Sequence, residues 1–332
     1  MKKSVFLMAA MAMACLAGCS KQHANVGLFY CAAESNSKFQ VDAMKEELEK
    51  KGLTAKLISF SDSNDIASVL NGNIDSVDSI YIPTDNTCAH SKEIIDSILR
   101  PAKKPVFAGE EGICEGCGAI TLSISYYNLG VKTGEMAVDV LLGKKQIGNL
   151  EVAKGNPIKK YNAANVQNLG ISVPSDYVEL SQKVAPDTLP EFQNTDNNRY
   201  KIGISQAVKH EALDAATKGF IDAVKSGLGA NNVTFDEQVA QDQSTIPTAV
   251  GKFVTDGVDL ILGNATPSLQ AACNATQTIP ILGTSVTDYA SALGLTNFDG
   301  VSHRNFSGTS DLVSPADQAD MIESVFSSFF KK

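Results

Sequence analysis

Residues 200–224, YKIGISQAVKHEALDAATKGFIDAV, combine an apolar run, a polar loop and a stretch with helical spacing. The run at 200–205 predicts a buried strand, because its apolar residues are closely spaced. Residues 206–210 are mostly polar, and the apolar residues of 212–224 recur every three or four positions, which predicts an amphipathic helix. A strand, a loop and a helix in this order form the repeating unit of parallel α/β sheets.

The same unit occurs in both halves of the chain. In the first half, an apolar run at 25–30 is followed by a polar loop at 32–37 and by helical spacing at 38–51. Near-continuous apolar strands that alternate with helices predict parallel sheets covered on both faces. We therefore expect an α/β protein of two doubly wound lobes, with a hinge and a cleft between them. Further strands are predicted at 54–60, 79–83, 105–109, 233–235, 259–262 and 279–283.

The composition is that of a globular protein. The 332 residues are 43% hydrophobic, 7% aromatic and 20% charged, which excludes collagen-like, low-complexity and disordered chains. The length is enough for two domains that each bury a core. A formal net charge of -9 without a long basic run argues against a nucleic-acid partner. The sequence has no oligomerisation signal, so we expect a monomer.

The N-terminus has the features of an export signal. Lys2 and Lys3 precede a short apolar run at 5–16, which ends in Leu16-Ala-Gly-Cys19. Small residues before this cysteine resemble the lipobox of bacterial lipoproteins, so we expect a signal peptide at 1–18 and a lipid on Cys19. The alternative is an ordinary signal peptide with a chance cysteine. No other stretch reaches the ~18 apolar residues of a membrane span. We therefore expect an exported protein, anchored by lipid to the extracytoplasmic face of the membrane.

Polar residues follow the predicted strands, where open α/β sheets bind their ligands. In the second half, Thr266 and Ser268 open a helix, and Thr284 and Thr287 end the next strand. Hydroxyls and free N–H groups at such a place suit a carboxylate. In the first half, an acidic pair at 110–111 lies between glycines and suits an ammonium group. Together the two sets favour a zwitterion such as an α-amino acid. The alternatives are helix caps and a solvated loop.

Several longer motifs point to one family. They resemble motifs of the substrate-binding lipoproteins of ABC importers, in the tryptophan/tyrosine-binding family, at residues 81–86, 107–112, 126–127, 134–137, 202–214, 265–267, 286–288 and 307–311. The resemblance implies a type I periplasmic-binding-protein fold, whose hinged cleft captures an amino-acid-like solute and delivers it to an ABC permease in the membrane. We therefore expect neither enzymatic activity nor a cofactor.

The two lobes stand in the reverse of the family's order. In the family, the lobe that begins like 202–205 comes first and the lobe that begins like 26–30 comes second. We therefore expect a circular permutation that joins the old termini through about residues 185–199. After the signal peptide at 1–18, the expected parts are the family's second lobe at 19–170, a tail and linker at 171–199, the family's first lobe at 200–311, and an interlobe helix with the new C-terminus at 312–332.

The family's layout and the chemistry of the loops together assign the candidate binding residues. The ligand's carboxylate is expected at Thr266, Ser268, Thr284 and Thr287, and its ammonium group at Glu111. Ala207 and Lys209 depart from the family, which often has a larger apolar residue and Glu there, so the preferred ligand side chain stays open. The residues expected to support the ammonium or to line the rest of the pocket are Asp85, Asn86, Gln206, His210, Ser35 and Asn36.

The cysteines allow a different chemistry. Cys114-Glu-Gly-Cys117 is compatible with a redox or metal site, but the glycines around it favour a loop. No second Cys-x-x-Cys and no His-x-x-x-His supplies further metal ligands. A local disulfide or two free thiols is the remaining interpretation. After removal of Cys15 and lipidation of Cys19, the number of remaining cysteines is odd, so at least one of them is unpaired: Cys31, Cys88, Cys114, Cys117 and Cys273.

An enzyme and a sensor are two competing interpretations of the same loops. Asp85 with Glu110 and Glu111 could supply the paired carboxylates of a glycoside hydrolase. However, the chain has no Trp to form a platform for a sugar, and no nucleophile elbow, Walker loop or His-Glu-x-x-His motif. A receptor module of the same fold, whose closure is read by a partner other than a permease, would share the ligand chemistry.

Overall fold

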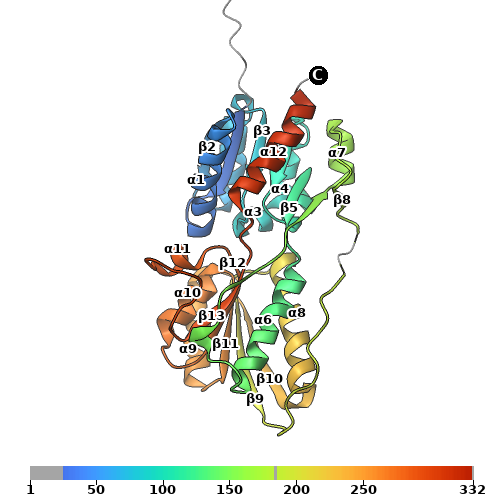
Figure 1. The fold of residues 1–332 in the computed structure, drawn as a ribbon. Coiled ribbons are helices and arrows are strands. Elements are labelled where there is room, and N and C mark those ends of the chain that lie inside the picture. Colours follow the sequence, from blue (N-terminus) through green and yellow to red (C-terminus); the bar gives the residue numbers. More distant parts are fainter. Residues whose placement is uncertain (1–24, 183–184, 331–332) are drawn as a thin grey trace, which may run out of the picture.

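Two lobes, each built on one sheet, make up the computed structural model, which describes residues 25–182 and 185–330 (Figure 1). The predicted signal peptide and Cys19 lie outside the described residues. Within the described ranges, no helix is long and apolar enough to cross a membrane.

The first lobe is a mostly parallel sheet with helices on both faces. Its strands lie in the order β2-β1-β3-β4-β5-β7-β8, and only the β5–β7 pair is antiparallel. The strands are β1 (Asn25–Cys31), β2 (Thr54–Phe60), β3 (Ser79–Ile82), β4 (Val106–Ala108), β5 (Ile120–Ser123), β7 (Ile158–Tyr161) and β8 (Val178–Glu179). The helices are α1 (Ser35–Lys50), α2 (Ile66–Asn73), α3 (Asn86–His90), α4 (Lys92–Leu99), α5 (Glu111–Gly116), α7 (Ala163–Leu169) and α12 (Pro315–Phe330).

The second lobe repeats this arrangement with a parallel sheet. Its strands lie in the order β10-β9-β11-β12-β13-β6. The strands are β6 (Ala153–Lys154), β9 (Tyr200–Gln206), β10 (Val233–Val239), β11 (Leu260–Asn264), β12 (Ile281–Val286) and β13 (Phe306–Ser310). The helices are α6 (Tyr126–Leu141), α8 (Glu211–Leu228), α9 (Ile246–Thr255), α10 (Thr266–Ala275) and α11 (Tyr289–Leu293).

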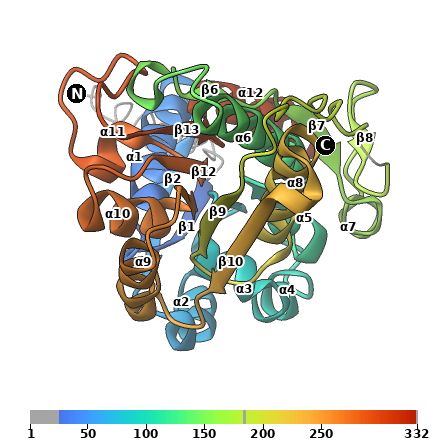
Figure 2. The same ribbon diagram turned by 90° about the horizontal axis from the view of Figure 1, so that it is seen from below.

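Helices cover both faces of each sheet, as the near-continuous apolar strands predict. In the first lobe, Leu28 of β1 belongs to the core beneath α1 and α12, while Phe29 belongs to the core beneath α2 and α4 on the opposite face. In the second lobe, Ile204 of β9 packs with α6 and α8, and Ile261 of β11 packs with α9 and α10. Figure 2 shows these two helix pairs on opposite sides of the second sheet. The prediction of two doubly wound lobes is confirmed.

Among the described residues, the chain crosses between the lobes at four places. The crossings run from β5 to α6, from β6 to β7, from β8 to β9 and from β13 to α12. An even number of crossings leaves both ends in the same lobe, and Figure 1 shows β1 and the end of α12 together in the first lobe. The first, second and fourth crossings join the lobes next to β5, β7 and β13, and together they form the hinge.

The third crossing leads into an extended segment that lies along the second lobe. Asp187 and Asn128 exchange two hydrogen bonds of 3.0 Å through Asp187 N and Asn128 Nδ2. Gln193 N donates to Gly227 O at 2.7 Å, and the buried amide of Asn194 donates to Leu228 O at 3.1 Å. Residues 185–198 are therefore held against α6 and α8.

Candidate functional site

A cavity lies between the lobes, where the carboxyl ends of strands from both sheets meet. Its volume is about 20 Å³, enough for one water molecule. An amino acid therefore enters it only when the lobes separate. The residues that line this interlobe cavity are Asn36, Thr84, Asp85, Asn86, Ala89, Glu110 and Tyr126 from the first lobe and the start of α6, and His210, Leu213, Thr266, Ser285, Thr287 and Asp311 from the second lobe and the hinge.

A few polar contacts join the lobes around this cavity. His210 Nε2 lies 3.3 Å from Asn86 Oδ1, and the hydroxyls of Thr84 and Thr287 lie 3.5 Å apart. Lys92 at the start of α4 forms an exposed ion pair of 3.4 Å with Glu211 of α8. Exposed ion pairs contribute little, about 0–1 kcal/mol. The closed arrangement is thus held by few direct contacts, and a bound solute can add substantially to them.

The structure brings together six of the candidate residues from the sequence. Their positions follow from the fold, because each comes directly after a strand or opens the next helix and so points toward the other lobe. These residues are Asn36, Asp85, Asn86, His210, Thr266 and Thr287.

Four other candidates lie away from the cavity. Ser268 Oγ accepts a hydrogen bond from Ser205 at 3.1 Å, and Thr284 Oγ1 accepts one from Thr309 at 3.2 Å, so both hydroxyls serve the interior of the second lobe. Gln206 is buried in the same lobe, where its amide donates to Asp214 Oδ1 at 2.7 Å. Ser35 is exposed at the start of α1. The side chains of Ser268, Thr284 and Gln206 are thus bonded within the second lobe.

Glu111, the expected ammonium partner, also lies outside the interlobe cavity. Both of its carboxylate oxygens accept hydrogen bonds of 2.7 Å from Lys160 Nζ, and the Lys160 side chain is only 4% exposed. Glu111 lines a neighbouring cavity of about 460 Å³ instead. Its charge is therefore already neutralised by Lys160, and the structure does not bring Glu111 to the interlobe cavity.

Two buried carboxylates of the first lobe line the interlobe cavity. Asp85 accepts from the N–H groups of Cys31 and Cys88 at 2.8 Å each, and Glu110 accepts from those of Gly112 and Ile113 at 2.7 and 2.5 Å. Burial raises the pKa of the Glu110 carboxyl to about 7 and that of Asp85 above its usual value. Both groups act as helix N-caps, at α3 and α5, and so position the loops of the first lobe.

Asp311 is a cavity residue that the sequence-based assignment missed. It follows β13 at the hinge and is 5% exposed, and burial raises the pKa of its carboxyl. Tyr126 at the start of α6 donates its hydroxyl to Asp311 Oδ2 at 2.9 Å, whereas no group reaches Asp311 Oδ1 with hydrogen-bond geometry, although the nearby Thr287 hydroxyl also lowers the pKa of this carboxyl. Its place at the end of one of the family-like motifs, 307–311, was the signal that the sequence offered.

The second lobe also presents unused donors to the cavity. Ser285 Oγ is buried without a hydrogen-bond partner, and the Ser285 backbone has φ 54°. Helix α10 begins at Thr266 after Ala265, which has φ 80° and gives the helix no side-chain cap. Non-glycine residues rarely adopt positive φ, and such strain is concentrated at functional sites. Within the first turn of α10, Pro267 has no N–H and those of Ser268 and Leu269 donate to Ala265 O, so the Thr266 N–H and the Ser285 hydroxyl are the donors suited to an anion here.

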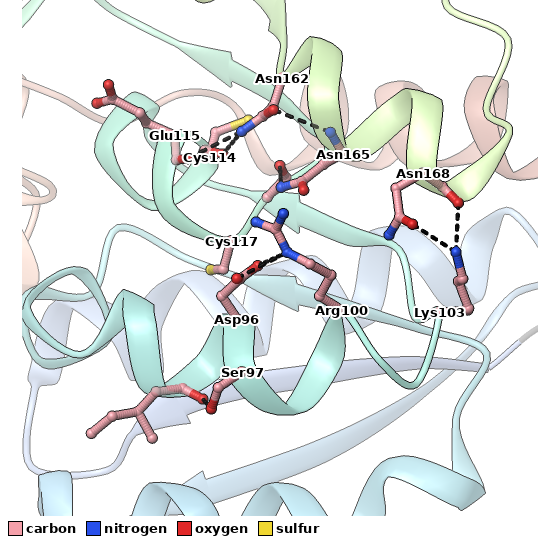
Figure 3. A network of polar contacts seen from close by, with 12 residues as sticks. Asp96, Ser97, Arg100, Lys103, Cys114, Glu115, Cys117, Asn162, Asn165 and Asn168 are labelled. Atoms are coloured by element: carbon pink, nitrogen blue, oxygen red, sulfur yellow. Dashed lines mark hydrogen bonds and ion pairs between the residues drawn. The ribbon is translucent and has the colours of Figure 1, made fainter.

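The Cys-x-x-Cys motif belongs to the first-lobe core. Cys114 and Cys117 are buried free thiols at the end of α5, and burial raises the pKa of both thiols. The amide of Asn162, at the start of α7, donates to the carbonyls of Cys114 and Glu115 at 3.2 and 3.0 Å (Figure 3). Reactive thiols need a lowered pKa and access to solvent. These contacts therefore favour a structural role in fixing α5 over a redox role.

One protein-family model matches residues of both lobes. The model for ABC transporter substrate binding proteins matches residues 21–185 and 201–329. A curated tyrosine-binding protein of Clostridioides difficile (strain R20291) is 43% identical over 150 residues, which are 44% of this chain and 42% of the relative. The match thus spans less than half of that relative's length.

Two solved structures extend the comparison. The ABC domain from Streptococcus pneumonia in complex with L-Trp is 30% identical, covering 47% of this chain and 55% of that chain with a TM-score of 0.42. An ABC transporter solute-binding protein from Mycobacterium smegmatis with bound glycerol is 13% identical, covering 92% of this chain and 88% of that chain with a TM-score of 0.59. The second likeness shows the two-lobed, type I periplasmic-binding-protein-like fold.

Proposed function

The chain belongs to the family of ABC transporter substrate-binding proteins, and we propose that it captures an amino acid between its lobes and hands it to a membrane permease. We further propose that a lipid on Cys19 anchors it to the extracytoplasmic face. The names of the relatives make tyrosine and tryptophan the first ligands to test.

One observation supports an amino acid more than any other. The interlobe cavity contains one buried donor and one buried acceptor that have no hydrogen-bond partner within the described residues. The donor is the Ser285 hydroxyl, and the acceptor is a carboxylate oxygen of Asp311. An unsatisfied buried polar group costs about 1–3 kcal/mol. A zwitterion offers an acceptor to the Ser285 hydroxyl and to the Thr266 N–H at the start of α10, and a donor to the Asp311 carboxylate. Thr266 and Thr287 would add further contacts to the ligand's carboxylate.

Closure of the lobes would couple binding to delivery. Because the cavity holds about one water molecule, the ligand binds to one lobe while the lobes are apart and is then enclosed. A ligand stabilises the closed state only by the difference between its binding free energies in the closed and open states. Polar atoms from both lobes line the cavity, so a bound amino acid would supply contacts that the few direct interlobe bonds do not.

A thermal-shift screen tests this function. We expect at least one of the twenty amino acids to raise the melting temperature of the mature protein, after unfolding and refolding to remove any carried ligand. A ligand at 100 times its dissociation constant adds ~2.7 kcal/mol, which corresponds to a shift of several degrees. A shift with a sugar or nucleoside but with no amino acid would contradict the proposal.

The two serines near α10 provide a matched prediction. Replacing Ser285 by alanine should weaken amino-acid binding by about 1.5–3 kcal/mol, because its hydroxyl would donate to a charged carboxylate. Replacing Ser268 by alanine removes a hydroxyl that bonds to Ser205 inside the lobe, so it should lower stability without changing affinity. Titration calorimetry measures both effects. Equal losses of affinity in the two variants would rule out a direct contact from Ser285.

We also propose that the order of the lobes is a circular permutation of the family's order. Removal of the third crossing, from β8 to β9, and connection of α12 to β1 would leave three crossings at the hinge. Both ends to be joined lie at the same end of the first lobe (Figure 1). Permutation is tolerated where termini are superficial and close together.

A reordered gene tests the permutation. A chain that starts at residue 200, joins 330 to 25 through a short Gly/Ser linker and ends at 182 should fold into the same two lobes. It should keep the cooperative melting and the ligand-induced shift of the original chain, since every strand pairing is retained. Loss of cooperative melting in the reordered chain would count against the proposal.

A further inference from the structure

We infer that Asp311 binds the ligand's ammonium group and that Tyr126 holds Asp311 in position for this contact. The inference rests on the proposed function, since it concerns the same cavity. The ligand's ammonium group would then lie at the hinge, where two crossings between the lobes meet. It would not lie at the acidic loop of the first lobe, residues 110–111.

The partners of the other carboxylates leave Asp311 as the free acceptor. Asp85 and Glu110 each use both carboxylate oxygens to accept backbone N–H groups at helix starts. Both oxygens of Glu111 are bound by Lys160, outside the cavity. Glu34 is also saturated, because it accepts from the backbone and side chains of Asn86 and Thr87. Asp311 alone, among the described carboxylates of the cavity, has an oxygen without a hydrogen-bond partner.

The surroundings of Asp311 make a cationic partner favourable. It is 5% exposed, and the structure shows no cation paired with it among the described residues. A buried carboxylate without a counter-charge is costly, whereas one paired through a charged hydrogen bond is stabilised. A primary ammonium group has three donors. One donor could reach Asp311 Oδ1 while the others reach neighbouring oxygens.

Tyr126 orients Asp311 without needing to touch the ligand. Its hydroxyl donates to Asp311 Oδ2 at 2.9 Å, and both side chains are buried. Tyr126 begins α6 directly after the β5 crossing, and Asp311 directly follows β13, before the crossing to α12. The bond therefore connects two strands of the hinge. A ligand held by Asp311 would be anchored at the point about which the lobes turn.

A ligand analogue tests the inference without altering the protein. L-tyrosine and its 2-hydroxy analogue, 3-(4-hydroxyphenyl)lactate, differ in the group that would meet Asp311. If L-tyrosine binds, the analogue should bind about 10- to 150-fold more weakly, the range expected for a lost charged hydrogen bond. If another amino acid gives the largest thermal shift, that amino acid and its 2-hydroxy acid are compared in the same way.

The matched variants Asp311→Asn and Glu111→Gln separate the two carboxylates. Asparagine keeps an oxygen that accepts from Tyr126, so Asp311→Asn should fold, and it should weaken binding of the amino acid by about 10- to 150-fold. Glu111→Gln should change affinity by less than about 3-fold. The reverse pattern, or equal binding of the hydroxy acid, overturns the inference while the proposed function stands. Failure of every amino acid to bind the wild-type protein overturns both.

Tyr126→Phe tests the positioning role. The substitution removes the donor to Asp311 and should weaken binding several-fold. Because that hydrogen bond lowers the pKa of the Asp311 carboxyl, its loss should shift the acid limb of the binding profile to higher pH. Asp85, Glu110 and His210 also line the cavity and remain unchanged in the variant, so the difference between the two profiles reports on Asp311. A uniform loss of affinity with an unshifted profile would reject the positioning role.

Discussion

Gly219→Ala is expected to lower the free energy of unfolding by about 3 kcal/mol, because α6 and α8 touch through their backbones. A Cβ atom on Gly219 would lie 2.1 Å from Tyr127 O, and one on Gly130 would lie 2.0 Å from Ala216 O. Carbonyl groups inside helices cannot rotate away. The two helices would have to move apart, and the core formed with Phe220 would lose packing.

The same substitution in an open place is the control. Gly251 lies within α9, and no atom lies within 4 Å of the position that an added methyl group would take. Gly251→Ala should therefore stabilise the protein by up to about 1 kcal/mol. Urea denaturation of the wild type and both variants measures the difference. If Gly219→Ala and Gly251→Ala both stabilise the protein, the helices do not approach as closely as the structure shows.

The close helix pair also matters for function. Tyr126, which contacts Asp311 in the cavity, is the first residue of α6, and His210 is the N-cap of α8. A change in the distance between these helices therefore moves cavity residues from two segments at once. We expect Gly219→Ala to weaken ligand binding even at temperatures where the protein remains folded.

The alternation of apolar runs with helical spacing was sufficient to predict four strands of each sheet, but not β5, β6, β7, β8 or β13. It was also sufficient to predict which loops meet, because the carboxyl ends of parallel strands share one edge of a sheet. Asp85, Asn86 and His210, which we assigned from these loops together with the family resemblance, line the interlobe cavity. Their positions depend only on the end of a nearby strand, which local sequence reveals.

The direction of individual side chains could not be predicted in the same way. The pairing of β12 with β13 is irregular between Gly283 and Val286, and positive φ at Ser285 brings Ser285 to the cavity while Thr284 bonds to Thr309. Glu111 lies outside the interlobe cavity for a different reason. Its partner, Lys160, comes from the antiparallel strand β7, 49 residues further along the chain. Such contacts depend on tertiary pairing, which motif spacing does not reveal.

His210 and Glu110 are expected to give opposite pH dependences of stability. Burial between the lobes lowers the pKa of His210 to about 4, from a usual value of 6.5, in the presence of Asp214, Lys92, Glu211 and His90. A lowered histidine pKa contributes stability that is complete above pH 6.5 and is lost as the pH falls through 4. The two values differ by about 2.5 units, which corresponds to about 3 kcal/mol.

A comparison with His210→Gln isolates this contribution. Between pH 7 and pH 4, the free energy of unfolding of the wild type should fall relative to that of the variant by about 3 kcal/mol. All other titrating groups are common to both proteins, so their effects cancel in the difference. Denaturation at each pH measures it. A constant difference across this range would show that His210 is not desolvated by closure.

Glu110→Gln should show the opposite trend, because burial raises the pKa of Glu110 from 4.5 to about 7. A raised carboxyl pKa contributes stability that is complete below pH 4.5 and is lost as the pH rises through 7. The wild type should therefore lose about 3 kcal/mol relative to this variant between pH 4.5 and pH 7. Since the two effects oppose each other between pH 4.5 and 6.5, each is measured as a difference between the wild type and its own variant, by denaturation at each pH.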